Sequence, residues 1–140
     1  MPASLVLICD IDETICTEFD RPVMIGVDLL RRLAKSQVEI HYVTSRPEET
    51  RAATEDFLAI HKLPYSRNLY LCPRHKGALR HKRETTEKIK RESRIVLSIS
   101  DSEEEEAASK EHNVPFLRID PEDFEASWRK AALELKPYLR

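Results

Sequence analysis

The fold is decided by residues 5–14, which read LVLICDIDET. An uninterrupted apolar run over residues 5–9 leads there into two aspartates, Asp10 and Asp12. Residues 38–43 (VEIHYV) and 95–99 (IVLSI) form two more runs of this kind. Short runs rich in Val and Ile are typical of strands that are covered on both faces in a parallel sheet. We therefore predict core strands over 5–9, 38–43 and 95–99, with weaker strands at 69–71 and 114–119.

Helical patterns fill the segments between these strands. Apolar residues recur at helical spacing from Val27 onward, which predicts a helix near 26–36, and further helices are predicted over 47–61, 80–91, 102–112 and 121–136. Pro47 is expected to open the second helix, and Asp120 with Pro121 the last one. The alternation predicts an α/β fold, a doubly wound Rossmann-like parallel sheet of about five strands with helices on both faces.

Composition indicates one domain, residues 1–140, whose 41% hydrophobic content suffices for a core. Charged residues nearly cancel to a net charge of -2, so no overall field draws the chain to nucleic acid or to a membrane. Cys9, Cys16 and Cys72 are too few and too scattered for a disulfide framework or a zinc knuckle. With no secretory signal and no apolar run of about 20 residues, we expect a cytoplasmic protein with no membrane partner.

Polar side chains follow each of the three core strands. They are Asp10 and Asp12 after the first, Thr44, Ser45 and Arg46 after the second, and Asp101 after the third. Open parallel sheets bind ligands at the carboxyl ends of their strands, so we expect these side chains to lie near one another. Clustered carboxylates repel one another unless a cation compensates them, and Mg²⁺ prefers oxygen ligands of this kind. The sequence therefore predicts a magnesium site at this end of the sheet.

The segment LVLICDIDET resembles the first signature of the haloacid dehalogenase (HAD) superfamily, in which apolar residues precede Asp-x-Asp-x-Thr. Later signatures follow in the order of that family. Thr44 matches the second, a Thr or Ser at the end of a strand; Lys82, in HKRETTEKI, matches the third; and Asp101 matches the acidic fourth. Together they extend over about residues 5–119. The resemblance implies a HAD-like fold and the activity of a phosphatase, a phosphoric monoester hydrolase.

Within the superfamily the chain is most similar to the phosphatase domain of polynucleotide kinase-phosphatases, through TSRPEETRAATEDFL, LYLCPR and HKRETTEKI. This similarity implies polynucleotide 3′-phosphate ends or nucleotides as candidate substrates. Two positions depart from the pattern. Ser100 precedes Asp101 where those relatives usually have a pair of aspartates, and Glu105 or Glu106 could supply the further acid that other HAD branches use. Ser45 stands where glycine is frequent.

The resemblance also implies a role for each matched residue. Asp10 attacks phosphorus and forms an aspartyl-phosphate, while Asp12 serves as general acid and then as general base. Mg²⁺ is held by Asp10, by the backbone carbonyl of Asp12 and by Asp101. Lys82 offsets negative charge, and Thr44 holds the transferring phosphoryl group together with backbone N–H groups at a helix start.

Two assignments stay open. Lys76 lies in the same basic stretch as Lys82 and is its rival for the catalytic role. Arg46, beside Ser45, could contact the substrate phosphate or pair with a glutamate of its own helix.

Spacing leaves no room for a cap domain. About 30 residues separate Asp12 from Thr44, and about 38 separate Thr44 from Lys82, whereas a folded domain needs about 50. An uncapped site is open to bulky phosphoesters. The rival interpretation is a receiver-like or degenerate HAD domain that binds phosphate or metal without turnover. Receivers place their lysine after the fifth strand, where this chain offers Arg118, whereas Lys82 precedes the strand that leads to Asp101.

Overall fold

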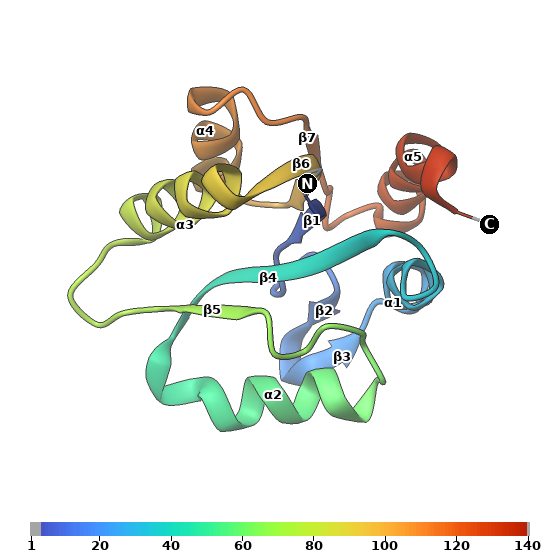
Figure 1. Ribbon diagram of the computed structural model, residues 1–140. Coiled ribbons are helices and arrows are strands. Elements are labelled where there is room, and N and C mark those ends of the chain that lie inside the picture. Colours follow the sequence, from blue (N-terminus) through green and yellow to red (C-terminus); the bar gives the residue numbers. More distant parts are fainter. Residues whose placement is uncertain (1–3, 140) are drawn as a thin grey trace.

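The computed structural model describes residues 4–139 and has a central sheet of five parallel strands in the order β5-β4-β1-β6-β7 (Figure 1). The sheet strands are β1 (Ser4–Cys9), β4 (Val38–Pro47), β5 (Leu69–Cys72), β6 (Ser93–Ser100) and β7 (Phe116–Arg118). The α-helices are α1 (Met24–Leu33), α2 (Arg51–Ile60), α3 (Ala78–Glu92), α4 (Glu103–Glu111) and α5 (Phe124–Leu135). The predicted α/β class and the predicted number of sheet strands are both confirmed.

Helices cover both faces of the sheet. Successive side chains of β1 therefore point into two different apolar clusters, one on each face. Leu7 and Cys9 belong to the larger cluster, to which α1, α2 and α5 contribute. Val6 and Ile8 belong to the smaller one, which α3 joins through Ile89. Figure 1 shows α3 and α4 together on one side of the sheet and α2 on the opposite side. Near-continuous apolar runs are therefore needed in the core strands, since neither face meets water.

The order of the strands reverses at β1. The chain proceeds from β1 to β4 and β5 on one side, then returns to place β6 on the other side of β1, followed by β7. Ligands of doubly wound sheets bind outside the carboxyl ends of the strands at such a reversal. Asp10 follows β1 and Asp101 follows β6. The topology therefore places both acids at the position where this fold binds ligands.

A small hairpin, which sequence patterns did not predict, lies between β1 and α1. It consists of β2 (Cys16–Thr17), the 3-10 turn η1 (Glu18–Asp20) and β3 (Arg21–Pro22), and its two strands pair antiparallel. We call residues 16–22 the flap. The flap occupies the connection that holds a cap domain in many HAD enzymes, and no cap domain is present in residues 4–139. The absence of a cap agrees with the prediction.

Two predicted helix starts are wrong. Pro47 does not open α2; it is the last residue of β4 and pairs with Cys72 of β5, and a 3-10 turn, η2 (Glu48–Thr50), precedes α2. Pro121 does not open α5 either, because Asp123 is the N-cap and accepts a hydrogen bond from the Ala126 backbone N–H at 3.1 Å. In both places a proline that suits a first helical turn equally suits a strand end or a turn.

The packing of α5 against α1 depends on Trp128. Its side chain is buried, and its Nε1–H donates to the Thr14 carbonyl at 2.9 Å. Gly26 of α1 allows this approach, because a Cβ atom at that position would lie 2.5 Å from the indole ring. The contact therefore joins α5 to α1 and to the loop that follows Asp10.

We expect Gly26→Ala to lower the free energy of unfolding by about 2 kcal/mol, since a rigid indole cannot move aside in a packed core. Urea denaturation measures the effect. Gly77→Ala is the matched control, because a Cβ there meets nothing within 4 Å, and it should change stability by less than about 1 kcal/mol. Equal losses in the two variants would contradict the packing argument.

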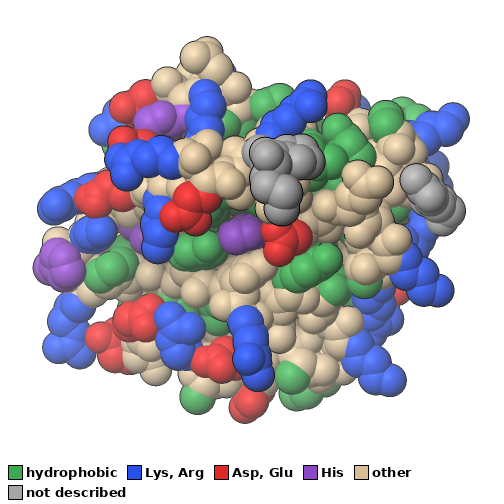
Figure 2. Space-filling model, viewed as in Figure 1, with side chains coloured by type: hydrophobic (Ala, Val, Ile, Leu, Met, Phe, Trp, Pro, Cys, Tyr) green, Lys and Arg blue, Asp and Glu red, His purple; other side chains and the backbone are tan. Residues whose placement is uncertain are grey.

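Charges of both signs alternate over much of the visible surface in Figure 2, and Lys and Arg side chains gather along its right edge, over α1 and α5. No helix within residues 4–139 is long and apolar enough to cross a bilayer.

Candidate active site

Asp10 is fixed in place by hydrogen bonds on both carboxylate oxygens. Its backbone N–H donates to the Ile99 carbonyl at 3.0 Å, which extends the pairing of β1 with β6 by one residue. Oδ1 accepts from the Ile11 backbone N–H at 2.7 Å, and Oδ2 accepts from the Ser100 hydroxyl at 2.7 Å. The side chain is 7% exposed. Asp10 is therefore a buried carboxylate with a fixed orientation, and it lies where the strand order reverses.

Lys82 supplies the positive charge beside Asp10. Its Nζ lies 3.1 Å from Asp10 Oδ2 and 3.8 Å from Glu105 Oε1, and it donates to the Val43 carbonyl at 2.8 Å. Burial alone would lower the pKa of Lys82, but the charges of Asp10 and Glu105 outweigh burial and raise it. Lys82 is therefore a permanent cation in the interior, held where β4, α3 and α4 meet.

Glu105, not Glu106, is the acid that α4 brings to this group. Glu105 is fully buried, and its Oε2 accepts from the Thr86 hydroxyl at 3.3 Å. Burial raises the pKa of Glu105 to about 7, against the opposing effect of Lys82. Glu106 instead pairs with Arg118 at 3.1 Å. Glu105 therefore lies in the interior as a partner of Lys82 and Thr86.

Asp101 lies beside Asp10 at the end of β6 and is held by Thr14. The Thr14 hydroxyl donates to Asp101 Oδ1 at 3.4 Å and accepts from the Asp101 backbone N–H at 3.2 Å. Burial, and next the negative charge of Asp10, raise the pKa of Asp101 to about 6. A carboxylate whose ionised form is disfavoured by a neighbouring negative charge is a natural place for a divalent cation.

Asp12 faces a different partner, the guanidinium of Arg46. Arg46 Nε donates to Asp12 Oδ2 at 3.0 Å, and Nη2 donates to Oδ1 at 2.8 Å. Nη2 also lies 2.7 Å from Asp20 Oδ1 in the flap. Burial alone would raise the pKa of Asp12, but the hydrogen bonds and charge of Arg46 outweigh it, so the pKa is lowered. Asp12 is therefore ionised in this arrangement.

The second predicted motif has a different local structure from the expected one. Thr44 is buried, and its hydroxyl accepts from the Arg46 backbone N–H at 3.1 Å, while the Ser45 side chain is exposed. All three residues belong to β4, because the strand continues to Pro47. α2 begins only at Arg51, so its first turn does not directly follow Thr44 in the chain.

The two open assignments have clear structural outcomes. Lys76 pairs with Glu84 at 2.9 Å on the surface, so Lys82 is the lysine that contacts Asp10. Arg46 forms no ion pair with a glutamate of its own helix; its carboxylate partners are Asp12 and Asp20.

One group of three possible metal ligands occurs within the described residues, namely Asp12, Cys16 and Asp20. It does not fit Mg²⁺, because the guanidinium of Arg46 already bonds to both carboxylates. Burial, and next the charge of Asp12, also raise the pKa of Cys16 to about 12, so it stays a neutral thiol. Asp10 and Asp101 lie outside this group, and carboxylate oxygens of this kind are the donors that Mg²⁺ prefers.

Sequence reasoning missed three side chains that orient the candidate residues. They are Ser100, which bonds Asp10, Thr14, which bonds Asp101, and Asp20, which bonds Arg46. Thr14 was visible as the last letter of Asp-x-Asp-x-Thr. Asp20 gave no signal, because flap strands of two residues have no detectable periodicity.

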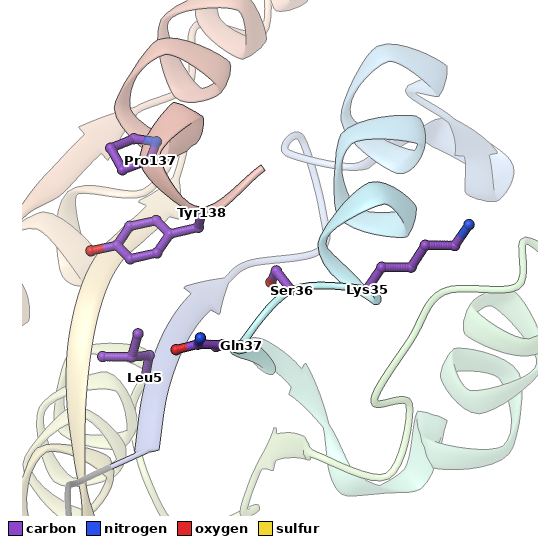
Figure 3. A pocket seen from close by; sticks show the side chains of 6 residues that line it. All are labelled: Leu5, Lys35, Ser36, Gln37, Pro137 and Tyr138. Carbon is purple, nitrogen blue, oxygen red and sulfur yellow. The ribbon is translucent and has the colours of Figure 1, made fainter. Parts of the chain in front are cut away.

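The end of the sheet opposite to Asp10 has a pocket of about 370 Å³ (Figure 3). Leu5, at the start of β1, lines it together with Tyr138 and Gln37. No aspartate or glutamate lines this pocket, so it offers none of the carboxylate chemistry found around Asp10.

No protein-family model and no curated protein sequence matches the chain. Solved structures do. A chain of the Pnkp1/Rnl/Hen1 complex superimposes with a TM-score of 0.72 at 18% identity, covering 84% of this chain and 46% of that chain. A chain of the Pnkp1/Rnl/Hen1 RNA repair complex gives 0.71 at 18% identity, covering 84% and 42%. This chain therefore spans less than half of the length of those two.

The class C acid phosphatase from Bacillus anthracis superimposes with a TM-score of 0.67 at 16% identity, covering 100% of this chain and 81% of that chain. Likeness at such low identity establishes the fold. The chain therefore has the same α/β fold as a chain of the Pnkp1/Rnl/Hen1 complex and as this class C acid phosphatase.

Proposed function

We propose that this chain is a Mg²⁺-dependent phosphomonoester hydrolase that works through an aspartyl-phosphate on Asp10. The observation that carries the proposal is the buried Asp10 carboxylate, oriented by two hydrogen bonds and neutralised by Lys82 at 3.1 Å, where the strand order reverses. A fixed carboxylate beside a fixed cation is suited to attack on phosphorus. The HAD-like fold supports this interpretation.

In the first half of the reaction, Asp10 forms a bond to phosphorus while the bond from phosphorus to the leaving oxygen breaks. Asp12 gives its proton to that oxygen. Asp12 is ionised while it is paired with Arg46, so it must leave this pair and take up a proton first. A substrate phosphate attracts the same guanidinium, which gives Arg46 a substrate-binding role. The positive charge of Lys82 offsets the negative charge of Asp10 throughout this half of the reaction.

In the second half, water attacks the aspartyl-phosphate and Asp12 accepts its proton. The pair with Arg46 suits this step, because it keeps Asp12 in the ionised form that a base requires. Release of phosphate then restores the Asp10 carboxylate. Thr44 and Ser45, at the end of the core of β4, are the remaining candidates for contact with the phosphoryl oxygens.

Mg²⁺ would be held by the carboxylates of Asp10 and Asp101 and by the backbone carbonyl of Asp12. The donor set fits, since a cation there offsets the mutual repulsion that contributes to the raised pKa of Asp101. When bound, the ion supplies positive charge that lets an anionic nucleophile approach an anionic phosphate. Ser100 has a neutral hydroxyl where a second aspartate would add negative charge to the site. This hydroxyl orients Asp10 by donating a hydrogen bond to it.

Residues 4–139 form no cap domain over the site, which suits phosphate groups on bulky molecules. Polynucleotide 3′-phosphate ends and nucleotides are the proposed substrates. The fold shared with a chain of an RNA repair complex supports this choice.

The test is phosphate release from an aryl phosphate, with Mg²⁺ and then with excess chelator. We expect turnover with Mg²⁺ and a fall of about 10³-fold or more in chelator, because repulsion between anions then opposes the attack. A panel of 3′-phosphorylated oligonucleotides, nucleotides, sugar phosphates and phosphopeptides ranks the substrates. Phosphate binding without any turnover would instead favour a degenerate domain that only binds phosphate, and full activity in chelator would refute the metal dependence.

A further inference from the structure

The tip of the flap carries a phenylalanine that the fold does not use. Phe19 is 91% exposed, the highest exposure of any large apolar side chain in residues 4–139. A side chain so exposed adds nothing to the core and exposes an apolar ring to water. A single exposed apolar side chain is ordinary on its own, so the backbone conformation and the contacts of its turn are what distinguish Phe19.

The backbone holds this ring outward in an unfavourable conformation. Phe19 has φ 59° and ψ 32°, and Asp20 has φ 53°, so two consecutive residues with a Cβ adopt the left-handed region. L-residues other than glycine avoid this region because Cβ approaches the backbone. Strain of this kind persists only where surrounding contacts enforce it, and it concentrates at ligand sites.

The contacts that enforce the turn come from the candidate active site. Asp20 accepts from Arg46 at 2.7 Å, and the same guanidinium donates to Asp12 and to the Thr54 hydroxyl at 3.1 Å. At the base of the flap, Cys16 forms an isolated β-bridge with Asp12. Phe19 thus stands one residue from an ion-pair network that includes the proposed acid-base group. The turn that carries Phe19 is therefore anchored to the proposed acid-base group through Asp20 and Arg46.

We propose that Phe19 is a platform on which a flat ring of the leaving group stacks, so that the preferred substrates carry a nucleobase. The inference rests on the proposed phosphatase activity and deepens it, because it assigns to one residue the selection of base-bearing substrates. A base stacks on one aromatic face without regard to its hydrogen-bonding pattern. The platform therefore selects substrates that have a base over substrates that have none, and it tolerates all four bases.

The test compares Phe19→Ala and Phe19→Trp on three substrates: a nucleoside 3′-monophosphate, a 3′-phosphorylated oligonucleotide and glycerol 2-phosphate. Phe19→Ala should reduce kcat/KM about tenfold on both base-bearing substrates, a typical effect of removing one stacking partner, and by less than about twofold on glycerol 2-phosphate. Phe19→Trp should retain the activity. Leu133→Ala, which truncates a 71% exposed side chain on α5, is the matched control and should change none of the three.

Equal losses on all three substrates, or no loss on the base-bearing ones, would overturn the platform. The two base-bearing substrates distinguish free nucleotides from nucleic-acid ends. Comparable rates on both would identify free nucleotides as sufficient substrates, and a higher rate on the oligonucleotide would identify nucleic-acid ends as the preferred substrate. Calorimetric binding in an Asp10→Asn background needs no turnover. There, Phe19→Ala should weaken binding of the nucleotide about tenfold. Absence of hydrolysis together with this weakening would refute the proposed activity alone, while unchanged binding would refute the platform.

Discussion

Replacement of Asp10 by asparagine is expected to lower phosphate release by about 10³-fold or more while leaving the fold intact. The amide has the size of the carboxylate, and its oxygen can still accept from the Ile11 backbone N–H. Its NH2 group takes the place of Oδ2 and can donate to the Ser100 hydroxyl, which reverses that hydrogen bond. The amide has no anionic oxygen with which to attack phosphorus. Steady-state release from an aryl phosphate measures the loss, and circular dichroism with urea denaturation checks the fold.

Asp12→Asn is the matched comparison, since Asp12 is a neighbouring acid with a different proposed role. An aryl alcohol leaves without much help from an acid, so this variant should form the aspartyl-phosphate yet hydrolyse it slowly. A burst of about one equivalent of aryl alcohol is expected, and none in Asp10→Asn. Substantial turnover in a folded Asp10→Asn protein would rule out Asp10 as the nucleophile.

The second large effect is expected from Lys82→Met, which removes both activity and stability. Methionine fills a similar volume, but it leaves the buried Glu105 and Asp10 without their cation. Loss of one partner from a buried charged group costs about 3–5 kcal/mol of unfolding free energy. Urea denaturation at pH 8 measures this loss.

The loss should shrink at lower pH, because Glu105 then takes up a proton. Its folded pKa of about 7 lies above the ordinary value of 4.5, so the stability it contributes is present below about 4.5 and is lost as pH rises through about 7. Lys82 opposes this rise in pKa, so its removal steepens the decline. We therefore expect a smaller effect of Lys82→Met at pH 5 than at pH 8.

Two further variants control this result. Lys76→Met removes a surface lysine from its pair with Glu84 and should cost less than about 1 kcal/mol. The double variant Lys82→Met with Glu105→Leu removes both buried charges and should recover part of the stability at pH 8. A loss that is the same at both pH values would show that packing, not charge, explains the role of Lys82.

The strand pattern was predictable because burial on both faces forces a continuous apolar run, as in residues 5–9. The ends of the strands were less predictable where pairing with a distant strand decides them. β4 continues through Thr44 to Pro47 because Pro47 pairs with Cys72, a partner that local sequence does not reveal. The flap was missed because its strands, of two residues each, depend on pairing with each other.

Within the candidate site, the residue types were predictable and their pairing was not. Asp10 and Asp101 do lie in one neighbourhood, since strand ends of a parallel sheet share an edge, and α3 brings Lys82 to Asp10. The bidentate bond of Arg46 to Asp12 was not expected, because it joins residues 34 positions apart. Phe19 likewise attracted no attention, since exposure depends on a backbone conformation that its sequence does not dictate.

Asp10 receives its hydroxyl partner from Ser100, 90 residues further along the chain, and Asp101 is held by Thr14 across 87. Contacts between such distant segments form late, after most of the loop entropy has been lost. A nascent chain therefore emerges from the ribosome with Asp10 already made but unsupported, and the candidate site is complete only when β6 inserts beside β1. Assembly of the candidate site is in this sense a marker of completed folding.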